Sequence, residues 1–73
     1  MNVIAAQELG QATLDLIEAL EQEPYAQDGC DFFASVAERL EAILETIATR
    51  GVVSENQARA LQNMHDGVAR WQR

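Results

Sequence analysis

One cysteine and one histidine supply the strongest nucleophile and the natural base in this 73-residue chain. Nucleophilic catalysis requires a nucleophile, a base within hydrogen-bonding distance and a third group that orients the base. Cys30 and His65 could take the first two roles, with Asp28, Asp31 or Asp66 in the third. The two carboxylates beside Cys30 disfavour its thiolate form. The sequence therefore favours a packed or linker cysteine and predicts a protein that is not an enzyme.

Metal binding has little support from the available ligand types. A transition-metal site would need further thiolate or imidazole ligands, and Cys30 and His65 are the only two. The run from Asp28 to Asp31 resembles part of a calcium loop but lacks the alternating acids and the terminal glutamate. We therefore expect no metal and no cofactor. For His65 we expect a half-exposed position beside an apolar stripe, with a pH-sensitive contact as the alternative.

Twelve acidic residues oppose five arginines, with no lysine, and give a formal net charge of −7. This balance argues against ordinary nucleic-acid binding and against an anionic membrane surface, because both need a basic face. The sequence shows neither a basic leader nor an apolar run of about 18 residues, so we expect a soluble, cytoplasmic protein. Residues 1–31 contain seven acids and no arginine. The negative excess at this end could align antiparallel neighbours, steer a basic partner or keep the protein soluble.

Apolar spacing predicts three helices, over residues 3–22, 31–50 and 55–71, and no strand. In the first, Asn2 is the expected N-cap and Pro24 ends the helix. The residues expected to face the core are Ala5, Leu9, Ala12, Leu16 and Leu20. Beside this face lies an apolar shoulder, formed by Val3, Gly10, Leu14 and Ile17. Together they make an apolar arc that is wider than one neighbouring helix would cover.

The second and third helices carry clear boundary signals. Asp28 or Asp31 is expected to cap the second helix, and Gly51 to end it in a left-handed conformation, with Val52 packing back on it. Ser54 and Gln57 form a capping box at the start of the third helix. The expected core positions are Phe33, Val36, Leu40, Ile43, Leu44 and Ile47 in the second helix, and Leu61, Met64, Val68 and Trp71 in the third.

The short connection at residues 51–53 predicts an antiparallel helical hairpin, with the first helix packed across it. The fold class is therefore all-α, a single three-helix bundle domain, with oligomers of such units as a further expectation. A chain this short buries only about 60% of its unfolded surface, so self-association or a partner would add stability.

Glu38, Glu41 and Glu45 follow one outer face of the second helix with no base at i+4. Like charges at this spacing destabilise a helix slightly, so the stripe is either a solvated face or a surface for a basic partner. Asp15 and Glu18 add to this acidic character on the first helix. Leu14 and Trp71 are the apolar counterparts, since we expect a three-helix core to leave them partly uncovered.

The helical hairpin contains a pattern made up of Phe33, Ser35, Val36, the run Arg50-Gly-Val-Val-Ser-Glu-Asn-Gln57, Leu61, Asn63 and Trp71. This pattern resembles one in small accessory proteins of phages and mobile elements. The resemblance covers about the last forty residues and implies no catalytic residues.

These features predict a non-enzymatic interaction module whose acidic helical face and apolar seam dock on a protein with a basic surface. In the phage-type interpretation the module is an inhibitor or adaptor acting on a host protein in the host cytoplasm. A stricter version of this hypothesis is that the N-terminal acids mimic a nucleic acid. The alternative is a self-assembling structural or regulatory helical oligomer, with the leftover apolar arc of the first helix as its symmetric seam.

Overall fold

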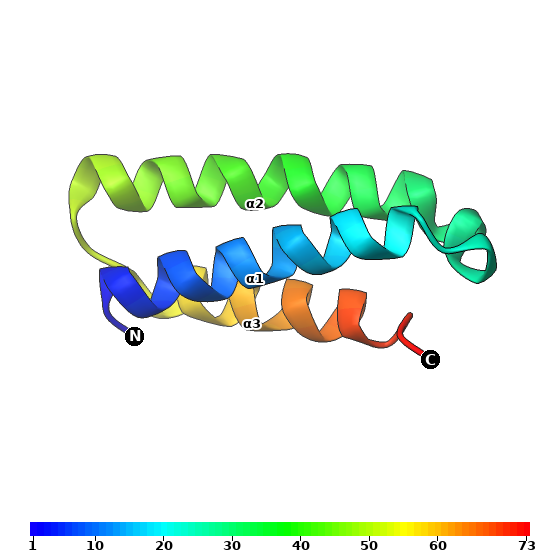
Figure 1. Cartoon of the computed structure of the whole chain (residues 1–73). Helices are drawn as coiled ribbons and strands as arrows, with labels where there is room; N and C mark the ends of the chain where they lie inside the picture. The colour runs from blue at the N-terminus through cyan, green and yellow to red at the C-terminus, as the bar shows by residue number, and fades with distance from the viewer.

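The chain forms three α-helices, and each runs antiparallel to the one before it (Figure 1). The computed structural model describes all 73 residues, with α1 at Val3–Glu21, a short 3₁₀ helix η1 at Pro24–Gly29, α2 at Cys30–Arg50 and α3 at Glu55–Ala69. α1 packs against both other helices, whereas α2 and α3 contact each other less. The molecule is elongated, with extents of 38 × 18 × 16 Å. The predicted all-α three-helix bundle is confirmed.

Three predicted helix boundaries are confirmed by their hydrogen bonds. The Asn2 side chain accepts a hydrogen bond from the Ala5 N–H at 2.7 Å, which caps α1. At the start of α3, the Ser54 hydroxyl accepts from the Gln57 N–H at 3.1 Å, and the Gln57 side chain accepts from the Ser54 N–H at 2.9 Å. Gly51 ends α2 in the left-handed region, with φ of 73°.

The helix starts within one residue of the predicted position, but the expected cap of α2 is wrong. Neither Asp28 nor Asp31 caps the helix, because η1 runs directly into it and Gly29 occupies the N-cap position. The Cys30 N–H donates to the Gln27 carbonyl instead, and Asp31 lies in the first turn, near the positive end of the helix dipole.

Two helices end slightly earlier than predicted, since α1 stops at residue 21 and α3 at residue 69. Val52, in the turn after α2, is 63% exposed and does not pack back on α2 as expected.

The core face of α1 is rotated from the predicted one. Its buried positions are Ala6, Gly10, Thr13, Ile17 and Leu20, whereas Ala12 is exposed and Leu9 and Leu16 are only half-buried. The missing side chain at Gly10 leaves room for Leu44 of α2, and Ala6 is fully buried. The predicted stripes of α2 and α3 largely hold, since the buried core residues there are Phe33, Val36, Leu40, Ile47, Leu61, Met64 and Val68.

Candidate interaction surfaces

The candidate nucleophile and base make separate contacts. Cys30 is half-buried at the first position of α2, and its thiol lies 3.8 Å from the Gln27 side-chain oxygen. His65 lies on α3, with Nδ1 3.7 Å from an Asp66 carboxylate oxygen. Its side chain is 31% exposed, as the border position predicted. The structure therefore does not bring together the three groups that nucleophilic catalysis would need.

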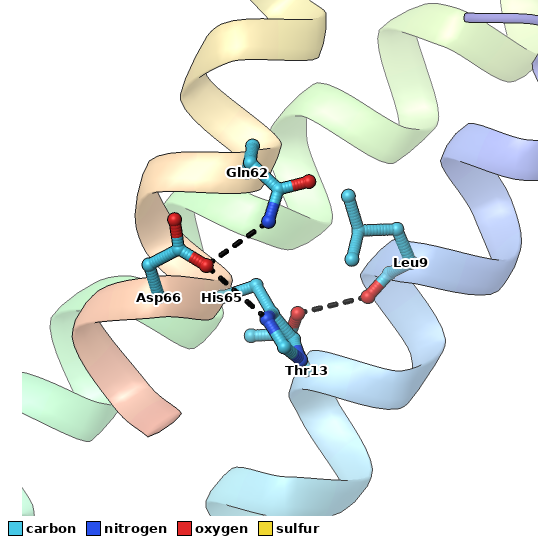
Figure 2. A network of polar contacts seen from close by, with 5 residues as sticks. All are labelled: Leu9, Thr13, Gln62, His65 and Asp66. Carbon is cyan, nitrogen blue, oxygen red and sulfur yellow. Dashed lines mark hydrogen bonds and ion pairs between the residues drawn. The ribbon is translucent and has the colours of Figure 1, made fainter. Parts of the chain in front are cut away.

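The polar groups around His65 lie where α3 faces α1 (Figure 2). The Asp66 carboxylate accepts a hydrogen bond from the Gln62 amide at 3.0 Å, and the fully buried Thr13 hydroxyl donates to the Leu9 carbonyl at 2.8 Å. His65 Nδ1 is buried without a hydrogen-bond partner. These bonds stay within single helices. No group of three His, Cys, Asp or Glu side chains is placed to hold a metal ion.

The carboxylates of α1 and α2 are exposed and unneutralised. None of the twelve acidic side chains forms an ion pair with an arginine. The only contact between a basic and an acidic side chain is that of His65 with Asp66. The sequence-predicted acids all lie at the surface. They are Asp15, Glu18, Glu38, Glu41 and Glu45.

Helical spacing places two of these acids, Glu18 and Glu41, beside the contact between α1 and α2. Gly10 faces α2, because Leu44 packs on it, so Leu14 and Glu18 at successive four-residue steps follow the same side of α1. Glu41 precedes Leu44 by three residues and borders the same contact from α2. We call Asp15, Glu18, Glu38, Glu41 and Glu45 together with Leu14 the acidic α1–α2 surface.

Leu14 is half-buried and packs against the core, so it is left partly uncovered, as the sequence predicted. The only large apolar side chain that α1 exposes is Ile4, at 68%. Self-association through α1 therefore lacks the broad apolar seam from which it was predicted.

A groove of about 560 Å³ lies between α2 and α3. Phe32 is 41% exposed at its wall, and two of the five arginines contribute to it, while no carboxylate does. The lining residues are Phe32, Val36, Arg39, Ala60, Asn63, Met64, Gly67, Arg70 and Trp71.

Trp71 lies beyond the end of α3 and is half-buried, so it is left partly uncovered, as the sequence predicted. Its ring meets Phe33 edge-on, with centroids 5.5 Å apart and planes at 74°. Arg73 lies over the Tyr25 ring at 4.8 Å and fastens the chain end to η1. Trp71 is thus part of the fold and also part of the groove wall.

Sequence reasoning missed the groove. Phe32 adjoins Phe33, and adjacent helical residues cannot both face the same core, so this pair was a signal that one ring is left outside. The residues of α3 that line the groove cannot be recognised until the relative positions of α2 and α3 are known.

No family model, no curated protein and no solved structure matches this chain. None of its helices combines the length and the apolar character needed to cross a membrane. Two surfaces of the molecule differ in charge from their surroundings: the acidic α1–α2 surface, which carries five carboxylates, and the groove between α2 and α3, which is lined by two arginines and no carboxylate.

Proposed function

We propose that this protein is a non-enzymatic interaction module that binds a protein with a basic surface through its acidic α1–α2 surface. The observation that supports this proposal is the lack of any arginine partner for the exposed carboxylates. Within α2, Glu38, Glu41 and Glu45 repel one another at three- and four-residue steps. A basic partner would relieve that repulsion.

The mechanism is recruitment or occlusion. The net charge of −7 accelerates encounter with a basic surface, and the acidic helices then cover that surface or hold it in place. The resemblance of the helical hairpin to small phage proteins extends the proposal, since it makes the partner a host protein and the module an inhibitor or adaptor.

Affinity capture with charge-matched variants tests the proposal. The wild type is compared with a variant in which Glu38, Glu41 and Glu45 are all changed to Lys. A control variant carries the same charge change at three exposed acids outside the surface, Glu23, Asp28 and Glu55. Mass spectrometry should identify a basic protein retained by the wild type and the control and lost from the first variant. Equal retention by all three would contradict the proposal.

The alternative function, a self-assembling helical oligomer, is tested by sedimentation equilibrium of the same three proteins. A stable oligomer of the wild type at about 100 μM, the scale of weak self-association, with no basic partner captured, would favour that alternative.

A further inference from the structure

We propose that the groove between α2 and α3 is a second docking site, which binds an acidic amphipathic helix of a partner protein. This site differs from the acidic α1–α2 surface in its position and in its charge, and it goes beyond the function proposed above. Three features support the proposal: the shape of the groove, the charge of its rim and the surfaces that a second copy of this chain could offer.

The groove has two apolar walls at helical spacing. Phe32, Val36 and Arg39 follow one another on α2 at steps of four and three residues, and α3 contributes the opposite stripe. An amphipathic helix presents its own apolar residues at these steps. Laid between α2 and α3, it would complete a four-helix bundle and cover the 41% of Phe32 that is exposed. The stripe on α3 is Ala60, Met64 and Gly67, and Trp71 continues it just beyond the end of the helix.

The charge of the groove selects an acidic occupant. Arg39 and Arg70 contribute to its lining, neither forms an ion pair within the chain, and the remaining polar side chain there is the neutral Asn63. In a chain with twelve acids, a concave apolar site lined by two arginines and no carboxylate is set apart from the rest of the surface. Arginine pairs readily with carboxylates at protein interfaces.

A second copy of the chain is a poor occupant. The large apolar side chains exposed outside the groove are Met1, Ile4 and Val52, which lie near the chain start and in the turn after α2, so no helix face offers an apolar stripe. Two grooves placed face to face would bring Arg39 and Arg70 of both copies together without a carboxylate between them. The geometry therefore points to a different protein.

A display library of amphipathic helices tests this site. Each member has about 18 residues, roughly five turns, with leucine at the apolar positions and either Glu or Lys beside them. The library is selected on the wild type, on an Arg39→Glu/Arg70→Glu variant and on a control variant, Arg50→Glu/Arg59→Glu, whose two exposed arginines do not line the groove. A recovered peptide is then titrated against the emission of Trp71, the only tryptophan, which lies in the groove wall.

The wild type and the control should enrich Glu-bearing helices, and the groove variant should lose them. A recovered peptide should shift the emission of Trp71 and bind Phe32→Ala at least about tenfold more weakly, as expected for the loss of a central aromatic contact. Reversal of Glu38, Glu41 and Glu45 should leave peptide binding intact, which separates this site from the proposed function. Equal enrichment of Glu and Lys helices, retention of the same peptides by the groove variant, or self-association blocked by Phe32→Ala would each overturn the proposal.

Discussion

Leu44 of α2 packs on Gly10 of α1 so closely that a Cβ at position 10 would lie 2.7 Å from both Leu44 methyl carbons and 3.0 Å from its Cγ. This contact sets the distance between α1 and α2. It also places Gly10 on the side of α1 that faces α2, where the missing Cβ leaves room for the Leu44 side chain.

Gly10→Ala should destabilise the fold by up to about 1 kcal/mol, since the half-buried Leu44 side chain must shift to admit the Cβ and this overpacking offsets the gain in helix propensity. Gly67→Ala is the matched control within a helix. Its Cβ would meet only the Phe32 Cζ, at 3.4 Å, so this change should stabilise the fold by about 0.5–1 kcal/mol. Urea unfolding followed by circular dichroism measures both.

The cause of the Gly10→Ala effect can be checked in a Leu44→Ala background. There the clash is removed, and Gly10→Ala should become neutral or stabilising. An unchanged penalty in that background would show that the contact with Leu44 is not its source.

The sequence was sufficient for the hairpin because its signals are local. The capping box at Ser54, the left-handed Gly51 and the apolar stripe of α2 all act within one or two helical turns. The face of α1 could not be predicted in the same way. Hydrophobicity favoured a face with Leu9 and Leu16, whereas close packing favoured the small residues Ala6 and Gly10, and packing depends on which helices meet.

The two candidate surfaces also differ in how far the sequence alone could predict them. The acidic stripe of Glu38, Glu41 and Glu45 could be predicted because it lies on a single helix. The groove could not, because Arg39 and Arg70 lie on different helices and neither is distinctive until α2 and α3 are placed side by side. Its sequence signal, Phe32 next to Phe33, indicates an exposed ring but not what faces it.

The turn after α2 should depend on the backbone of Gly51 alone. A side chain at this position would meet nothing within 4 Å, so any loss of stability reports conformational strain at φ of 73°. Gly51→Ala should cost about 1 kcal/mol and Gly51→Val more, because a β-branched residue is poorly accommodated there. Gly51→Asn should cost least, since asparagine tolerates the left-handed region. Unchanged urea midpoints for all three would contradict this explanation.

Trp71 and Phe32 both line the groove but should differ in their effect on stability. Trp71→Ala removes an edge-on contact with Phe33 and should destabilise the fold by about 2 kcal/mol. Phe32→Ala removes a partly exposed ring and should cost less than about 1 kcal/mol. Thermal and urea unfolding of the two variants measure the difference. A larger loss for Phe32→Ala would mean that its ring is a core element rather than an available contact.

Reversal of Glu38, Glu41 and Glu45 to Lys should leave the isolated fold intact, since all three side chains are exposed and currently repel one another. Binding of a captured basic partner should weaken mainly through slower association, and the wild-type complex should lose affinity as salt rises, because screening shortens the range of the attraction. Surface plasmon resonance at low and high salt separates the two rates. If the association rates of wild type and variant are equal, these glutamates serve solubility, and the partner binds elsewhere on the molecule.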